Sequence, residues 1–152
     1  MTERYKPNTT VACIIRADQH YLMVEEMIDG RLQYNQPAGH LEPNESLITA
    51  CQREVQEETG IHLVPKALVG IYQFSANTDL AFVRYTFCAS LDKQIAPNPQ
   101  DPAILNAKWL TFEEILTLKT QLRSPLVLQS LKDYRNNPHY PLSILNDQYL
   151  SL

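Results

Sequence analysis

Four glutamates and one arginine lie close together in a short segment of the chain. Glu45 precedes Arg53, and Glu54, Glu57 and Glu58 follow it. In a helix, residues separated by three or four positions lie on adjacent turns, so the last three glutamates would bring their negative charges close together. Mg²⁺ and Mn²⁺ are hard cations that prefer oxygen ligands and would compensate this repulsion. The spacing therefore predicts a divalent-metal site on a helix, where Arg53 could orient one carboxylate through a bidentate contact.

The predicted helix begins after Pro43 and ends at Gly60. Asn44 can cap the exposed amides of the first turn, and Glu45 would lie near the positive end of the helix dipole. Gly60 is a typical helix stop. At about 100° per residue, one face would pack and a second stripe would present the carboxylates. The packing residues are Ile48, Cys51, Val55 and Thr59.

A helix face rich in glutamate is usually only solvated, and the pattern E-x-x-E-E alone would be interpreted that way. The residues around it change this interpretation, because together they match G-x5-E-x7-R-E-U-x-E-E-x-G-U, where U is aliphatic. This is the signature of the Nudix hydrolases. A chance match is expected in fewer than about one in a million chains of this length at ordinary residue frequencies. The chain resembles that family at Gly39, Glu45, Arg53, Glu54, Val55, Glu57, Glu58, Gly60 and Ile61.

The resemblance implies an α/β fold, an α/β/α sandwich in which helices flank a mixed β-sheet. It also implies hydrolysis of a diphosphate linked to another group, with Mg²⁺, or Mn²⁺ in its place, neutralising the phosphate oxygens while water attacks phosphorus. Carried over to this sequence, it makes Glu57 and Glu58 metal ligands, and Glu54 a ligand or the base that activates water. Arg53 would orient Glu54, and Glu45 would support the metal site. The catalytic set implied is therefore Arg53, Glu54 and Glu57.

The resemblance also assigns roles outside the helix. The backbone near Ala38 and Gly39 would approach the metal or the phosphate, and Gly39 suits this because it has no obstructing side chain. A simple turn glycine is the alternative. Many members use a later acidic residue as base or extra ligand, and Asp101 in the Pro-rich segment is the candidate by position. Ala103 stands where an acidic residue is expected, which leaves the distal base open.

Segments outside the signature narrow the resemblance to a subgroup of Nudix phosphatases. That subgroup implies release of phosphate from hydroxymethylpyrimidine diphosphate, thiamine diphosphate and nucleoside di- and triphosphates. The alternatives are a Nudix hydrolase of ADP-ribose or dinucleoside polyphosphates, a non-catalytic nucleotide-binding Nudix module, and an enzyme that trims the 5′ end of RNA. The intact set of carboxylates argues against the binding module. The segments are NQPAGHLE at 35–42, LRSPLV at 122–127 and YPL at 140–142.

Arg84 is the first candidate for substrate binding. If it alternates with Phe82 and Thr86 on one strand face, it could meet a phosphate in the cleft or form a salt bridge on the sheet surface. Arg123 could contact phosphate or cap a helix. Aromatic side chains could stack on a pyrimidine ring, although aromatics on strands more often pack in a core. These are Tyr34, which we expect to bind substrate, and Tyr72, Phe74 and Tyr85.

Composition limits the class of protein. With 152 residues and 44% hydrophobic residues, the chain is predicted to form one hydrolase domain, residues 1–152, with a real core. A net charge of -4 without a run of Lys or Arg argues against a nucleic-acid polymer as partner. A small diphosphate bound through metal remains compatible. No segment approaches the roughly 20 apolar residues of a membrane span, so no membrane partner is expected.

The cysteines Cys13, Cys51 and Cys88 lie in apolar segments without C-x-x-C spacing. Buried, reduced thiols are therefore expected rather than disulfides or zinc ligands, which favours a cytoplasmic location. We also expect a monomer. The histidines show no ligand spacing, although His40 follows Gly39 closely enough to meet substrate.

Periodicity and turn residues predict the elements that position this site. Strands are expected before the helix, where Asp29-Gly30 offers a tight turn, and again after it. Pro37 and Gly39 should break regular structure, and a Pro-rich loop should follow the fifth strand. Two more helices should follow, one with a capping box at Thr111 and Glu114 and one that starts at Ser124 and Pro125. The predicted strands are 11–16, 21–27, 31–35, 67–74, 81–91 and 107–110.

Overall fold

The computed structural model describes residues 3–150, and the strands in this part of the chain form one seven-stranded sheet. The strands are β1 (Asn8–Ala17), β2 (His20–Ile28), β3 (Arg31–Asn35), β4 (Ala38–His40), β5 (Ala67–Ser75), β6 (Ala81–Ser90) and β7 (Ile104–Thr111). Their order is β3-β2-β1-β6-β5, with β4 paired to β1 and β7 paired to β2. β1 and β6 run parallel, whereas the other pairs are antiparallel. The sheet is therefore mixed, as predicted.

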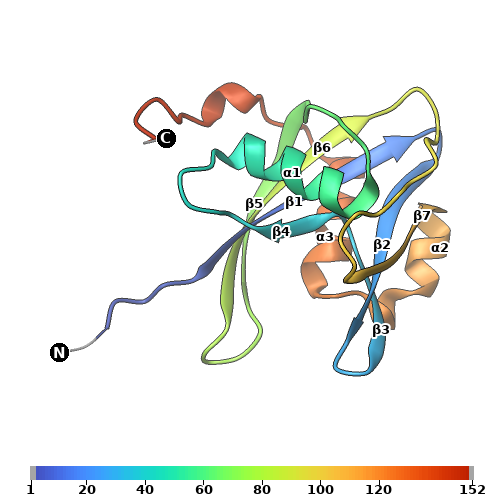
Figure 1. Cartoon of the computed structure of the whole chain (residues 1–152), viewed down its shortest axis with the longest axis horizontal. Coiled ribbons are helices and arrows are strands. Elements are labelled where there is room, and N and C mark those ends of the chain that lie inside the picture. The colour runs from blue at the N-terminus through green and yellow to red at the C-terminus, as the bar shows by residue number, and fades with distance from the viewer. Residues whose placement is uncertain (1–2, 151–152) are drawn as a thin grey trace.

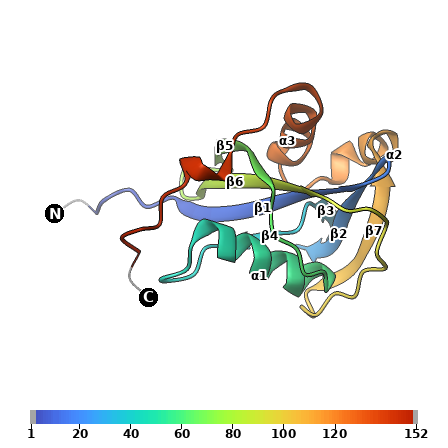
Figure 2. The same ribbon diagram turned by 90° about the horizontal axis from the view of Figure 1, so that it is seen from above.

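Helices cover both faces of the sheet, as Figures 1 and 2 show. The helices are α1 (Leu47–Thr59), α2 (Phe112–Thr117) and α3 (Pro125–Asn136), with short 3₁₀ turns at Lys119–Gln121 and Leu142–Ile144. α1 lies across β1 and β4 on one face, and α2 and α3 lie on the other. This arrangement confirms the predicted α/β/α sandwich.

Strands β1 and β2 are buried on both faces because helices cover both. In β1, Val11 and Cys13 pack in the core beneath α1, whereas Ile14 packs in the core beneath α2 and α3. Successive side chains of a strand point to opposite faces, so a strand covered on both sides needs a continuous apolar run rather than alternation. The run at the centre of β1 therefore follows from its central place in the sandwich.

The two later helices start as their sequences predict. Thr111 and Glu114 form a reciprocal capping box at α2, and Ser124 caps α3 with Pro125 in the first turn. The hairpin turn at Asp29 and Gly30 is also present, and both residues have positive φ, 51° and 76°. None of the helices within residues 3–150 is long and apolar enough to cross a membrane.

Helix α1 starts later than the sequence indicates. Ser46, rather than Asn44, is the N-cap, and its hydroxyl accepts a hydrogen bond from the Thr49 N–H at 3.0 Å. Asn44 instead has a φ of 58° in a turn where the Glu45 N–H donates to the Glu42 carbonyl at 3.3 Å. Asparagine favours both turns and caps, so its presence alone does not distinguish them. Glu45 consequently lies before the helix and not in its first turn.

The break predicted at Pro37 is present, because Gln36 and Pro37 form a bend between β3 and β4, whereas the break predicted at Gly39 is absent. Ala38–His40 forms β4, which pairs antiparallel with Thr10–Ala12 of β1. Proline is tolerated here because it lies just before the strand, where its missing N–H is not needed. The carbonyl of Pro37 still accepts a hydrogen bond from the Cys13 N–H at 3.0 Å. β7 likewise begins earlier than predicted, at Ile104.

Gly60 ends α1 as predicted. Its φ is 74°, and its N–H donates to the Gln56 carbonyl at 2.8 Å. A Cβ at this position would collide with the backbone carbonyl of Asn98, in the loop before β7. Gly60 is therefore required both by its left-handed conformation and by the close approach of that loop.

We predict that Gly60→Ala destabilises the protein more than Gly30→Ala. Both glycines have left-handed φ, 74° and 76°, but a Cβ on Gly30 would meet nothing within 4 Å. Strain alone should cost about 1 kcal/mol at Gly30, and strain plus the collision about 2 kcal/mol or more at Gly60. Urea unfolding of both variants measures the difference, and equal losses would show that the loop does not restrict Gly60.

Candidate active site

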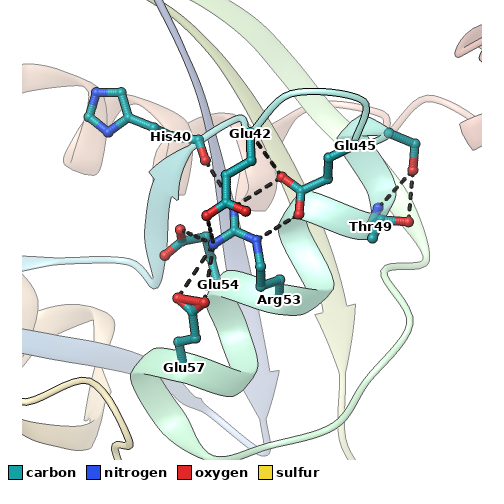
Figure 3. Close-up of polar contacts among 8 residues, drawn as sticks. His40, Glu42, Glu45, Thr49, Arg53, Glu54 and Glu57 are labelled. Atoms are coloured by element: carbon teal, nitrogen blue, oxygen red, sulfur yellow. Dashed lines mark hydrogen bonds and ion pairs between the residues drawn. The ribbon is translucent and has the colours of Figure 1, made fainter. Parts of the chain in front are cut away.

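Arg53 lies at the centre of the acidic side of α1 (Figure 3). Its Nε and Nη2 donate to the two carboxylate oxygens of Glu45 at 2.6 and 3.0 Å. Its Nη1 donates to Glu54 at 2.7 Å and to Glu57 at 3.2 Å, and its Nη2 also donates to the His40 carbonyl at 3.0 Å. The bidentate contact of Arg53 is thus made with Glu45, while a single hydrogen bond reaches Glu54.

These contacts fix the loop before α1 to the helix itself. The Glu45 carboxylate also accepts a hydrogen bond from the Glu42 N–H at 3.0 Å. Hydrogen bonding to Arg53 lowers the pKa of Glu45, and the same bond raises the pKa of Arg53. Both groups are therefore held in their charged forms. Glu45 acts on the other carboxylates through Arg53 rather than by direct contact.

Glu58 points into the protein, toward β4. It is only 5% exposed, and its Oε1 accepts a hydrogen bond from the Ala38 N–H at 2.9 Å. Burial raises the pKa of Glu58 to about 9, although the bond from Ala38 opposes this shift. The negative charges of Glu26, Glu54 and Asp101 raise it further. Glu58 therefore differs from Glu57, which remains partly exposed on the outer side of the helix.

Gly39 lies directly against the carboxyl group of Glu54. A Cβ on Gly39 would overlap the carboxyl carbon and both oxygens of Glu54. Gly39 does not have positive φ, so the requirement is for space rather than for an unusual backbone conformation. Burial raises the pKa of Glu54, and Arg53 opposes the shift. The close contact of β4 with α1 thus places a second partly buried carboxylate beside Glu58.

The loop that carries Asp101 is attached to the last turn of α1. The N–H groups of Gln100 and Asp101 both donate to the Glu57 carbonyl at 2.8 Å, and the Asn98 N–H donates to the Thr59 carbonyl at 2.7 Å. The charge of Asp101 raises the pKa of three carboxyl groups, those of Glu26, Glu54 and Glu58. The structure therefore brings Asp101 beside the acidic helix, as its predicted role requires.

A cavity of about 940 Å³ is lined by Ala38 and Gly39, whose backbones contact Glu58 and Glu54. Glu26 supplies a carboxylate to its wall, and the N-terminal turn of α3 also lines it. Phe74 and Phe82 contribute its aromatic surface. Basic side chains also face it, namely Arg84, Lys119, Arg123 and Lys132. The cavity thus joins an acidic end, suited to a cation, to a basic wall, suited to an anion.

Arg84 reaches this cavity from β6 and is 6% exposed. Its Nη2 donates to the Asn35 side-chain oxygen at 3.1 Å and to the Gln36 side-chain oxygen at 2.7 Å. Burial lowers its pKa to about 10. Within residues 3–150, Arg84 forms no salt bridge to a carboxylate within 4.0 Å, so the surface salt bridge considered from the sequence is absent. Arg123 also lines the cavity, as an exposed side chain.

Tyr34 does not line the cavity. Its side chain is 6% exposed and packs in the core beneath α2 and α3, with the Lys108 ammonium 5.9 Å from its ring centre. Asn35 lines the cavity instead, because neighbouring residues of a strand point to opposite faces. Tyr34 would therefore not contact a substrate bound in this cavity, contrary to the expectation from the sequence. Of the other aromatic candidates, Phe74 lines the cavity, whereas Tyr72 bonds to Asp133 and Tyr85 packs toward α1.

Glu26 is the site residue that the sequence analysis missed. It lines the cavity from β2, and its pKa is raised by burial, with Arg123 opposing the shift. Along β2, Glu26 is on the same strand face as Leu22 and Val24, which pack in the core beneath α1, and its register to β3 is regular. The extra residue in the β2–β7 pairing, Leu105, lies in β7. The alternation therefore indicates the face of Glu26, but no local pattern shows that this end of β2 lies beside the cavity.

The carboxylates suit a divalent metal, although they do not form a coordination shell. In the part of the chain described, residues 3–150, no three His, Cys, Asp or Glu side chains converge closely enough to hold an ion. Arg53 engages Glu54 and Glu57, and the Ala38 N–H engages Glu58. The donors are nevertheless all oxygens, and Gly39 leaves room beside Glu54 that a side chain would fill. A hard cation would favour the ionised form of the buried pair Glu54 and Glu58.

Comparison with known proteins extends the resemblance to most of the chain. The family model of the NUDIX domain matches residues 6–131. Phosphatase NudJ from Escherichia coli strain K12 is 41% identical over 143 residues, which cover 94% of this chain and 93% of NudJ. NudJ represents the phosphatase subgroup indicated by the segments at 35–42, 122–127 and 140–142.

Solved structures agree with this fold. A NUDIX hydrolase from Nitrosomonas europaea is 43% identical with a TM-score of 0.85, covering 93% of this chain and 97% of that chain. A bifunctional NMN adenylyltransferase/ADP ribose pyrophosphatase from Francisella tularensis, complexed with AMP and a Mn ion, is 18% identical with a TM-score of 0.73. That match covers 86% of this chain and 42% of the other, and at this identity it shows the fold alone.

We predict that the metal-free protein loses stability as pH rises because of Glu58. The pKa of Glu58 is about 9 in the folded protein against an ordinary value of 4.5. Between these values the unfolded chain releases the proton that the folded protein keeps. This contribution to stability is therefore complete below pH 4.5, falls as pH rises, and is lost above about pH 9.

Glu58→Gln should flatten this decline and raise the melting temperature above that of the wild type at about pH 8. Melting curves in a chelating buffer over the pH range measure the effect. Glu113→Gln, an exposed change on α2 that also removes one negative charge, is the control. A Glu58→Gln variant with the pH dependence of the wild type would contradict the burial argument.

Proposed function

Because the chain belongs to the Nudix hydrolase family and is a hydrolase of phosphoric anhydrides, we propose that it is a Mg²⁺-dependent phosphatase of small diphosphates. The proposed substrates are hydroxymethylpyrimidine diphosphate, thiamine diphosphate and nucleoside di- and triphosphates, with release of inorganic phosphate. The observation that carries this proposal is a cavity whose wall combines Glu26 and the backbone that contacts Glu54 and Glu58 with four basic side chains. The relative named phosphatase NudJ supports phosphate as the product.

Nudix hydrolases use divalent metals, and Glu54, Glu57 and Glu58 would hold one here, with the backbone near Gly39 close by. Their oxygen donors favour Mg²⁺, with Mn²⁺ as a substitute. A bound metal would neutralise phosphate oxygens and lower the pKa of a coordinated water. The role of Arg53 would be to hold Glu54 and Glu57 in position, since it donates hydrogen bonds to both at 2.7 and 3.2 Å.

The cavity suits a small diphosphate better than a polymer. Its volume of about 940 Å³ lies within the range of small-molecule sites. Arg84 and Arg123 would contact phosphate oxygens, and Phe74 and Phe82 would contact the ring of the substrate. Four of the 13 Lys and Arg residues line this cavity, the chain has no run of basic residues, and its net charge is -4. A long RNA or DNA would require a wider basic surface.

The proposal is tested by incubating the purified protein with Mg²⁺ and a panel of diphosphates, measuring phosphate and pyrophosphate separately. The panel should include the proposed substrates, ADP-ribose, dinucleoside polyphosphates and triphosphorylated RNA. Phosphate released from the pyrimidine or nucleoside diphosphates is the expected result. Turnover confined to ADP-ribose or dinucleotides, or a preference for RNA, would retain the hydrolase chemistry but overturn the substrate class.

Glu57→Gln should abolish turnover while leaving the fold intact. The change removes a proposed metal ligand with little change in shape, and Glu57 is partly exposed, so folding does not depend on it. Activity should fall by more than about 100-fold, the upper end for residues that only support a metal ligand. Steady-state rates and melting curves are compared with those of Glu113→Gln. Normal turnover in Glu57→Gln would show that the metal site is assigned to the wrong residues.

We propose Asp101 as the distal base, because its loop is fixed to the last turn of α1. Glu26 is the alternative, because it lines the cavity. Loss of a general base lowers the rate by about 10²–10⁴-fold. Asp101→Asn should therefore lower kcat by at least about 100-fold and Glu26→Gln by less than about tenfold. Rates measured as a function of pH decide between them, and the reverse order would assign the role to Glu26.

We further propose that residues 1–152 work as one hydrolase domain, as a monomer, in the cytoplasm. Cys13, Cys51 and Cys88 are all buried and free, which agrees with a reducing compartment. Light scattering of the purified protein would test the monomer.

A further inference from the structure

Arg84 is a buried cation whose neighbours do not neutralise it. It is 6% exposed, and its hydrogen bonds run through Nη2 to the side-chain oxygens of Asn35 and Gln36. Its Nε is buried and has no hydrogen-bond partner within residues 3–150. A buried charge is normally paired with an opposite charge, because removing it from water is costly. Here both hydrogen-bond acceptors are neutral amides, so the guanidinium keeps its full charge.

Gln36 fixes the position of this guanidinium. It is 1% exposed, its Oε1 accepts the bond from Arg84 at 2.7 Å, and its Nε2 donates to the Val127 carbonyl of α3 at 2.9 Å. The Gln36 side-chain amide therefore connects β6 to α3, since its oxygen accepts from Arg84 and its nitrogen donates to Val127. A glutamate would fill the same space, but it would pair with Arg84 and has no N–H for Val127. The structure thus uses the residue type that holds Arg84 without cancelling its charge.

The uncompensated charge lies in the wall of the proposed substrate cavity. Arg84 and Asn35 line the same cavity as Gly39 and Ala38, and the Ala38 N–H donates to Glu58 at 2.9 Å. Glu58 attracts Arg84 only through space, because its carboxyl group is directed to that N–H. Within residues 3–150 the Nη1 of Arg84 makes no hydrogen bond and, unlike Nε, is not among the buried unpartnered atoms, so it is the group left for a ligand that enters the cavity.

We propose that Arg84, held by Gln36, is an anion receptor that binds a phosphoryl oxygen without the help of metal, and that Gln36 is its positioning residue. The proposal rests on the proposed function only in assigning this phosphoryl group to the diphosphate substrate. The receptor itself requires no turnover. Arginine suits the role because its planar guanidinium presents several donors in a fixed geometry.

The first test measures binding of inorganic phosphate by calorimetry in the presence of a chelator. The wild type should bind saturably, and Arg84→Met should bind about 10- to 100-fold more weakly, since hydrogen bonds to charged groups are strong. Arg31→Met is the matched control, because Arg31 is exposed on β3 and does not line the cavity. Equal phosphate affinity in the wild type and Arg84→Met would overturn the proposal.

The second test separates the effect of a charge at position 36 from the effect of side-chain shape. Gln36→Glu is closer in shape to the natural residue than Gln36→Met, yet it should weaken phosphate binding more, because the new carboxylate pairs with Arg84. It should also raise the KM of a diphosphate more than it lowers kcat. Gln73→Glu, an exposed change on β5, is the control for the added charge. If Gln36→Met were as damaging as Gln36→Glu, Gln36 would be only a packing residue.

Melting curves show whether each variant is folded. If Arg84→Met does not fold, Arg84→Lys replaces it. Phosphate affinity should still fall by about tenfold or more, because an ammonium lacks the planar fork of donors. Phosphate binding that depends on Arg84 in a protein without phosphatase activity would refute the proposed substrates and keep the receptor. Phosphatase activity together with phosphate binding that is independent of Arg84 would refute the receptor alone.

Discussion

The hydrogen bonds of Arg53 are the interaction on which the acidic site depends. Glu45, Glu54 and Glu57 all bond to this one guanidinium, and it also reaches the backbone at His40. Without it, neighbouring carboxylates on adjacent helix turns would repel one another. A lysine could balance part of the charge, but it could not contact these groups at fixed angles from one planar fork. Arg53 therefore lets an acidic helix fold and sets the direction of its carboxylates.

Burial divides the same helix into two electrostatic environments. Glu57 faces outward beside Arg53, whereas Glu58 faces β4, where the Ala38 N–H is its one hydrogen-bond donor among residues 3–150. The difference arises because α1 packs against β1 and β4 with one side only. Adjacent helix residues point about 100° apart, so Glu57 faces solvent while Glu58 faces the sheet. If Glu58 is a metal ligand, as proposed, its protonated and cation-bound forms would therefore compete with each other. The outer carboxylates lack this competition because they already have a cationic partner.

Local patterns in the sequence were sufficient to predict the acidic cluster around Arg53 and several helix ends. The signature located Arg53 and its glutamates, and Gly60 ended α1 because its backbone conformation suits few other residues. The start of α1 was not determined, since Asn44 and Ser46 both carry capping side chains and only the folded turn decides between them. The strand β4 depends on pairing with β1, which no local pattern reveals.

The walls of the cavity could be predicted only in part. Arg84 faced the cavity because strand alternation with Phe82 held true, and both line it. The same reasoning did not locate Tyr34 or Glu26. Tyr34 lies on the face of β3 that packs in the core beneath α2 and α3, whereas Glu26 keeps the alternation of β2 but lies at the end of that strand. Which face and which end of a strand line a cavity depends on the layers of the folded sheet.

The backbone contacts that attach the loop before β7 to α1 explain its unusual content of proline. Asn98, Gln100 and Asp101 use their N–H groups on carbonyls of α1, whereas Pro97 and Pro99, which have none to offer, occupy the intervening positions. Proline restricts the unfolded chain, so less conformational entropy is lost when the loop docks. The loop can thus hold an acidic residue in place without belonging to any helix or strand. A proline at 98, 100 or 101 would remove one of these donors, so the positions of the prolines are what allow a stiffened loop to stay attached to α1.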